Sequence, residues 1–289
     1  MRMRAVRFEI TVVTLSWMTL LLLMLTLTIP PPSHAAVFFD TSFETCVVGG
    51  GASFPCEGWN DFDQEAAGVI GVATDQVFSG SKSFKQTLTK ADGDGNLSKP
   101  SIFKSFPAGD HAFFRWANKW SVPFQACTIN GQTKFVRLKT NLGYPLIWIV
   151  NHFGSYAMLF ENSYGGGNPL LTTGVPVTTG KWDQLEVEWK LNTPGQANGL
   201  LRFWINGALK VEVLNKEMRG PTPTSVNPTT GAPMPSTGQI TNTQIYVQCG
   251  AGNVWYDRFA VGNTRIGLAT SQTSSDTAPP VIPLGVQVR

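Results

Sequence analysis

Positively charged side chains and proton-transferring side chains recur together between residues 111 and 160. Arg137 and Lys139 stand two residues apart in KFVRLKT, so both project from one face of a strand. Cations can neutralise a carboxylate, and His or Tyr can take or return a proton at neutral pH. The candidate cations are Arg115, Lys119, Arg137 and Lys139. The candidate proton-transferring and orienting residues are Asn151, His152, Tyr156 and Tyr246.

The strand that follows these residues carries the clearest periodicity in the chain. From Trp182 to Leu191 apolar and polar residues alternate, which predicts a strand buried on one face. The expected core side chains are Leu185, Val187, Trp189 and Leu191.

A hairpin is predicted next, from strands at Leu200–Trp204 and Ala208–Val213. A three-residue loop, Ile205–Gly207, pairs Phe203 with Leu209 and keeps one face apolar. We therefore expect this loop, with Gly207 in the left-handed region.

The remaining segments also indicate strands, and no helical periodicity is sustained beyond the N-terminus. With 29 Gly, 19 Pro and 14% charged residues, the composition is typical of an all-β protein with many turns. The tract from Asn215 to Thr243 is rich in Pro, Thr, Ser and Gly. It is expected to be a disordered or loose surface excursion, with the next strand beginning at Gln244.

Several of these motifs resemble the concanavalin A-like jelly-roll superfamily, and most of all its polysaccharide lyases of the heparin- and alginate-lyase type. They are the Trp182 strand, the Asn192–Gly195 turn, the FWINGALKV hairpin, the Ser79–Ser83 step and the closing WYDRFAV strand. The resemblance implies a two-sheet antiparallel β-sandwich from about Ala36 to Ala269. The last strand would pair with the first.

The resemblance also implies β-elimination of a uronic-acid glycan in a groove on one sheet. His152, Tyr156, Tyr246 and Asn151 are then the candidate catalytic residues, with His152 preferred. Arg115, Lys119, Arg137, Lys139 and Trp204 are the candidate substrate-binding residues. The chain departs from alginate-lyase relatives, since it has no Arg-x-Glu-x-Arg, Gln-x-His or Tyr-x-Lys-x-Gly-x-Tyr strand.

Two alternatives remain open at this point. A non-catalytic carbohydrate-binding or adhesion module would stack sugars on an exposed aromatic, for which Trp204 is the candidate. A laminarinase-type glycoside hydrolase would need two carboxylates. Glu186 and Glu188 share one face, but Gln184 replaces the first acid of that family's strand and Asp183 has the wrong parity.

Four cysteines allow three disulfide connectivities, of which we favour Cys46–Cys56 with Cys127–Cys249. No cofactor is required. The resemblance implies a structural calcium near Asp40, Glu44 and Asp257, and satisfied turn carboxylates are the alternative.

Residues 1–35 resemble a signal peptide, with three arginines, an apolar run and cleavage after Ala35 or Ala36. An uncleaved membrane anchor is the alternative. Without this segment the net charge falls from +3 to +1, which argues against a nucleic-acid partner. We expect a secreted or periplasmic monomer that acts on extracellular polysaccharide. Residues 270–289 resemble a linker and the start of a fibronectin type III domain.

Overall fold

The computed structural model describes residues 36–49, 55–59, 61–63, 68–90, 101–128, 131–161, 164 and 169–271. All of these residues fall within one compact unit, Ala36–Arg289. The expected signal peptide and most of the expected C-terminal linker lie outside the described residues. No described helix has the length and hydropathy needed to cross a membrane.

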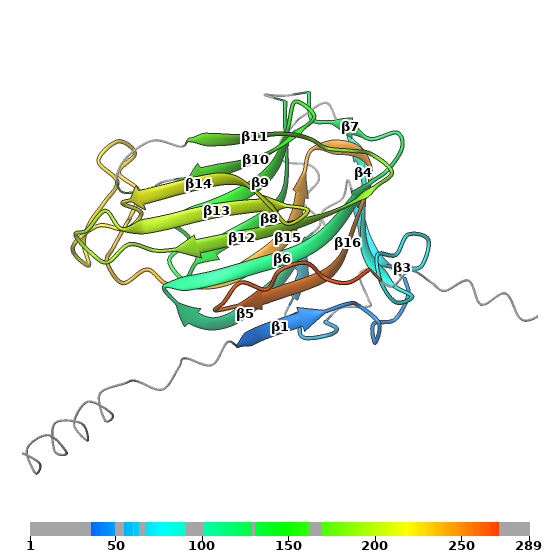
Figure 1. The fold of residues 1–289 in the computed structure, drawn as a ribbon, viewed down its shortest axis with the longest axis horizontal. Coiled ribbons are helices and arrows are strands. Elements are labelled where there is room, and N and C mark those ends of the chain that lie inside the picture. The colour runs from blue at the N-terminus through cyan, green and yellow to red at the C-terminus, as the bar shows by residue number, and fades with distance from the viewer. Residues whose placement is uncertain are drawn as a thin grey trace, which may run out of the picture. The chain divides into compact units, whose positions relative to one another are not determined.

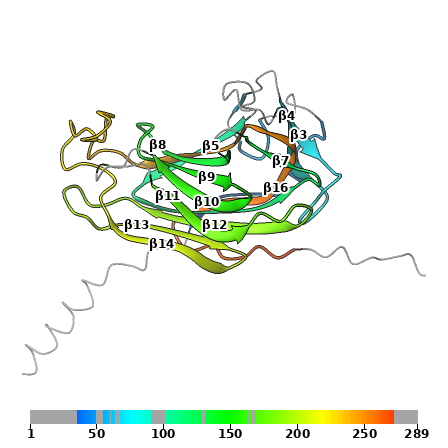
Figure 2. The ribbon, with the colours of Figure 1, turned by 90° about the horizontal axis from the view of Figure 1, so that it is seen from above.

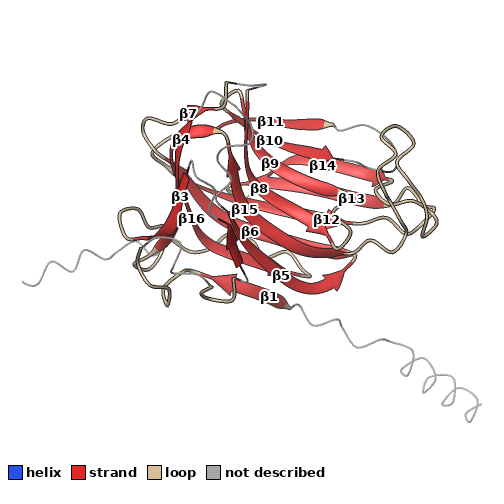
Figure 3. Ribbon diagram, turned by 180° about the vertical axis from the view of Figure 1, so that it is seen from behind, coloured by secondary structure: helices blue, strands red, loops and turns tan. Residues whose placement is uncertain are grey.

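The described chain folds into two antiparallel sheets, which confirms the all-β sandwich of jelly-roll type (Figures 1 and 3). One sheet has nine described strands in the order β14-β13-β12-β6-β16-β4-β3, and β1 and β7 also pair with β16. Its strands are β1 Val37–Thr41, β3 Gly68–Ala73, β4 Ser83–Lys90, β6 His111–Trp120, β7 Gln125–Ala126, β12 Trp182–Lys190, β13 Gly199–Ile205, β14 Ala208–Lys216 and β16 Gly250–Gly262.

The second sheet has seven described strands in the order β11-β10-β9-β8-β15-β5-β2. Its strands are β2 Asp61–Asp63, β5 Ser101–Gly109, β8 Gln132–Thr140, β9 Leu146–His152, β10 Ser155–Glu161, β11 Leu170–Pro176 and β15 Ile240–Gln248. Figure 2 shows β8, β9 and β10 in one layer and β12, β13 and β14 in the other. The predicted pairing of the last strand with the first is confirmed, because β1 pairs with β16.

The main core fills the space between the two sheets. The predicted inward residues of β12 and the turn that follows it, Leu185, Val187, Trp189 and Leu191, are all buried. They meet Phe135, Ile149 and Met158 of the opposite sheet within one cluster. Each large apolar side chain contributes about 1.5–3 kcal/mol by leaving water. Because one face of each sheet is committed to this core, the opposite faces are the ones that can hold a site.

The predicted hairpin loop is wrong by one residue. Ile205 pairs with Ala208, so the loop is the two-residue Asn206-Gly207, with φ of 50° and 80°. Away from the loop, the register shifts between Trp204 and Phe203, so that Trp204 pairs with Leu209 but Phe203 pairs with Val211. This β-bulge absorbs the extra residue and returns the apolar side chains to one face. The left-handed Gly207 is confirmed.

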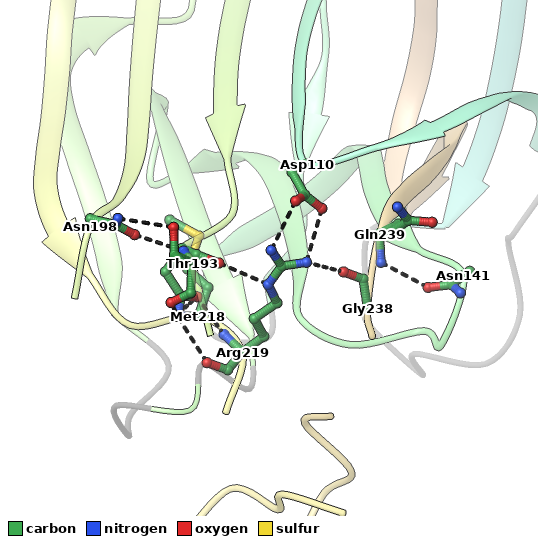
Figure 4. A network of polar contacts seen from close by, with 9 residues as sticks. Asp110, Asn141, Thr193, Asn198, Met218, Arg219, Gly238 and Gln239 are labelled. Atoms are coloured by element: carbon green, nitrogen blue, oxygen red, sulfur yellow. Dashed lines mark hydrogen bonds and ion pairs between the residues drawn. The ribbon is translucent and has the colours of Figure 1, made fainter. Parts of the chain in front are cut away.

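The expected looseness of the long tract is also wrong. Residues 217–239 form an ordered loop held by Arg219 (Figure 4), and β15 begins at Ile240 rather than Gln244. The Arg219 guanidinium donates to both carboxylate oxygens of Asp110, at 2.9 and 3.0 Å, and to the Gly238 carbonyl at 2.7 Å. Asn141 and Gln239 exchange two hydrogen bonds of 2.9 Å each, which fixes the loop against the turn after β8.

The two favoured disulfides, Cys46–Cys56 and Cys127–Cys249, are both confirmed. The second joins the segment before β8 to the end of β15. The neighbouring strands β8 and β15 are therefore tied near one end by a disulfide, and near the other by the Arg219 loop.

Candidate functional site

The outer face of the seven-stranded sheet gathers cationic, aromatic, amide and acidic side chains from four strands, β8, β9, β10 and β15. Because side chains alternate along a strand, Ile147 and Ile149 enter the core while Trp148 between them faces outward. We call this surface the cationic face. It is defined by Lys134, Arg137, Lys139, Trp148, Glu161, Gln244 and Tyr246.

Strand register places Arg137 at the centre of the cationic face. Arg137 lies opposite Trp148 of β9 on one side and opposite Gln244 of β15 on the other. Its Nη2 donates to the Gln244 Oε1 atom. A register shift between Lys134 and Val136 turns Lys134 to the same face as Arg137, although the two residues are three apart in sequence.

Two of the cations, Lys134 and Arg137, pack over the indole ring of Trp148. Lys134 Nζ lies 4.4 Å, and Arg137 Cζ 4.9 Å, from the centre of a Trp148 ring. Tyr246 packs beside this tryptophan at a centroid distance of 5.2 Å, and Arg137 Cζ also lies 5.2 Å from the Tyr246 ring. Cation–π attraction holds a side chain without consuming the N–H groups that could bind a ligand.

Positive charge on this face exceeds the negative charge that the structure describes there. Lys134 forms an ion pair of 3.1 Å with Glu161. Among the described side chains, no carboxylate lies within ion-pair distance of Arg137 or Lys139. Burial lowers the pKa of Arg137, and burial together with repulsion from Arg137 lowers the pKa of Lys139. A bound anion would relieve both penalties.

Three of the predicted catalytic residues do not join this cluster. Tyr156 points into the core, where its hydroxyl donates to Asp183 at 2.9 Å. Asn151 is also buried, and its side-chain oxygen accepts the Gly154 amide. His152 is half-buried and shares the outward parity of Trp148. It lies four residues further along β9, which places its Cα atom about 13 Å from that of Trp148. Of the four, only Tyr246 lies beside Arg137.

The structure divides the predicted substrate-binding residues between the two sheets. Arg137 and Lys139 lie on the cationic face, whereas Arg115, Lys119 and Trp204 belong to the nine-stranded sheet. Trp204 is not an exposed platform, because it is 7% exposed and Arg265 lies 4.7 Å from its ring centre. Every tryptophan in the described part of the chain is buried or half-buried.

The paired carboxylates of the hydrolase alternative are fully engaged in structural contacts. Glu186 accepts the amides of Ile266 and Gly267 at 2.8 and 2.9 Å and pairs with Arg265. Glu188 pairs with His111 and Arg202. Neither carboxylate is placed to act on a sugar.

The expected calcium ligands do not fit a cation. Glu44 accepts the amides of Ser81 and Lys82, and Asp257 accepts those of Phe78, Ser79 and Arg258. These N–H donors point towards the carboxylate oxygens that would have to face the metal. The described residues contain no group of three or more potential His, Cys, Asp or Glu ligands. Burial raises the pKa of Asp257 to about 7.

Comparison with solved structures gives the same architecture. A fungal endo-β-1,4-glucuronan lyase from Trichoderma reesei aligns with a TM-score of 0.53 at 18% identity, over 72% of this chain and 92% of that one. An alginate lyase from Aplysia kurodai aligns with a TM-score of 0.54 at 8% identity, over 78% and 99%. The cellulose-induced protein Cip1 aligns with a TM-score of 0.52 at 17% identity, over 80% and 100%.

No family model matches the chain, and no curated protein does. The chain therefore has a jelly-roll fold like that of polysaccharide lyases, and at these identities the likeness concerns the fold alone.

Four residues of the cationic face were not predicted from the sequence, namely Lys134, Trp148, Glu161 and Gln244. Trp148 is hidden in an apolar run, PLIWIVNHF, which predicts a strand buried on both faces. The two-residue spacing of Arg137 and Lys139 indicated a shared face, whereas Lys134 is three residues from Arg137 and reaches that face only through the bulge. The pairing of β15 with β8 brings Gln244 to Arg137 over a separation of 107 residues, which no local pattern encodes.

Proposed function

We propose that the cationic face binds a uronic-acid polysaccharide and cleaves it by β-elimination. Arg137 neutralises the carboxylate of the sugar at the cleavage point. Lys139 and Lys134 hold neighbouring acidic groups, and Tyr246 transfers the proton.

The reaction needs three events, and the residues account for each. A base takes the proton from C5, and that bond's electron pair forms the C4=C5 double bond. The C4–O bond then breaks, and the departing oxygen takes its electron pair and a proton. Negative charge develops on the carboxylate as the C5 proton leaves, so a fixed cation there lowers the barrier. One tyrosine can take the first proton as phenolate and return it to the leaving oxygen.

The observation that carries this proposal is the pair of cations, Arg137 and Lys139, with no carboxylate partner among the described side chains. A buried positive charge is costly unless it meets an anion. Arg137 is held in place by Gln244 and by two aromatic rings instead, so its position is set before any ligand arrives. Two solved structures with this fold are a glucuronan lyase and an alginate lyase, which supports the proposal of a lyase.

Ultraviolet absorbance tests the proposal, since elimination leaves a double bond conjugated with the carboxylate and hydrolysis does not. The protein is incubated with alginate, glucuronan, pectic and heparin-like polymers. We expect a rise with at least one polymer, and loss of that rise in Tyr246→Phe. A rise that survives in Tyr246→Phe and disappears in His152→Ala would assign the proton transfer to His152. No rise with any polymer would contradict cleavage.

A further inference from the structure

A cavity opens beside the central strands β6 and β16 of the nine-stranded sheet, where β6 ends, and it is not part of the cationic face. It has a volume of about 400 Å³, within the usual range for small-ligand pockets. It is lined by Asp75, Gln76, Lys119, Ser121, Asn253 and Trp255, among others. Trp255 of β16 lies opposite Lys119 of β6 on one side and opposite Lys85 of β4 on the other.

Three of the lining side chains, those of Lys119, Gln76 and Asn253, each make one side-chain hydrogen bond and keep further donors available. Lys119 Nζ donates to Gln76 Oε1 at 2.5 Å, which leaves two ammonium protons and the Gln76 amide N–H groups. Asn253 Oδ1 accepts from Thr87 at 2.7 Å, which leaves the Asn253 amide N–H groups. These are fixed donors of the kind that a preformed site requires.

The carboxylate that lines the cavity, Asp75, already accepts two hydrogen bonds. Asp75 accepts from the Trp255 indole at 2.9 Å and from Lys85 at 2.6 Å. Counting the two lysines Lys85 and Lys119 together with Asp75, the formal charge of this group is +1. The cavity is thus rich in donors and positive, and it suits a ligand that offers many acceptors and one negative charge.

We infer that this cavity is a second saccharide site, which takes one acidic sugar residue. A uronate offers a carboxylate to Lys119 and hydroxyl and ring oxygens to the Gln76 and Asn253 amides. The ring of the sugar fills space that an inorganic anion would leave open. The site would hold a polysaccharide chain on the sheet opposite the cationic face, and it does not depend on cleavage there.

Calorimetric titration with a glucuronan oligosaccharide tests this inference in the Arg137→Ala protein, whose cationic face is disabled. We expect residual binding, and we expect Lys119→Ala to weaken it about tenfold or more, because hydrogen bonds to a charged group are lost. Lys210→Ala is the matched control, since Lys210 is an exposed lysine on the same sheet. A cello-oligosaccharide of equal length, which lacks the carboxylates, should bind at least tenfold more weakly.

Three results would overturn the inference. They are no binding in Arg137→Ala, equal binding in the Lys119→Ala and Lys210→Ala backgrounds, and equal affinity for the neutral oligosaccharide. Melting temperatures of the variants establish that each is folded. Absence of cleavage by the wild-type protein would contradict only the proposed function, because this titration measures binding in a protein that need not cleave.

Discussion

The outer faces of the two sheets carry similar residues and use them in opposite ways. On the nine-stranded sheet Arg202 lies between Glu188 and Glu212, and Arg265 pairs with Glu186. On the seven-stranded sheet Arg137 and Lys139 have no such partner among the described side chains. Each face also has a tryptophan under an arginine, at 4.9 Å for Trp148 and 4.7 Å for Trp204.

The difference separates charges that hold the fold from charges that can hold a ligand. A charge already paired with a neighbour gains little from a new anion, whereas an unpaired and partly buried one gains much. The cationic face thus departs from the local rule that buried charges are paired, and such departures are expected at functional sites.

The largest effect should come from removing the central cation. Arg137→Ala should lower the elimination rate by about 10²–10³-fold, the usual cost of losing one donor to a developing negative charge. Steady-state absorbance measures it. Arg202→Ala, on the opposite face, should stay within about twofold of the wild-type rate, and equal losses in the two variants would remove the distinction between the faces.

The next largest effect should be on stability, from a substitution on the nine-stranded sheet. Glu186→Ala should lower the free energy of unfolding by about 1–3 kcal/mol, because the amides of Ile266 and Gly267 lose their acceptor. Denaturant unfolding measures the change, and elimination activity below the melting temperature should be retained. Loss of activity in a folded Glu186→Ala protein would instead assign this carboxylate a role in the reaction.

A smaller effect is expected at the aromatic support of the cations. Trp148→Leu should weaken binding of an acidic oligosaccharide about 5- to 30-fold, since two cation–π contacts contribute about 1–2 kcal/mol together. Trp148→Phe should keep most of the affinity, and Trp204→Leu should leave it unchanged. If Trp148→Phe and Trp148→Leu weaken oligosaccharide binding equally, Trp148 contributes shape rather than attraction for the cations.

The smallest effect is a shift in titration. Arg137→Gln should raise the pKa of Lys139, because the repulsion that disfavours its ammonium form is gone. The pKa should stay below that of a free lysine, since burial is the larger cause. Lysine side-chain NMR follows the titration, with Arg202→Gln as the control. An unchanged pKa of Lys139 would mean that the two cations do not interact.

Local patterns predicted the strands well and the site only in part. The alternation from Trp182 to Leu191 predicted the core residues of β12, and the spacing of Arg137 and Lys139 predicted a shared face. The hairpin loop was predicted one residue too long, because a bulge at β14 restores the face that a longer loop was invoked to explain.

The failures at the site have two physical causes. Parity along β9 and β10 depends on which face is covered, so Asn151 and Tyr156 could not be assigned to the interior before the sheets were known. Lys134 and Gln244 reach Arg137 through a bulge and a distant strand pairing, and sequence spacing records neither.

The most direct test of the contrast between the faces follows the indole N–H signals of Trp148 and Trp204 by NMR during titration with an acidic oligosaccharide. Both rings are nearly buried and both lie under an arginine, so they report on matched surroundings. Binding at the cationic face predicts that the Trp148 signal moves with saturation and that the Trp204 signal stays in place. Movement of the Trp204 signal with a constant Trp148 signal would mean that the ligand does not bind the cationic face, and it would contradict the account.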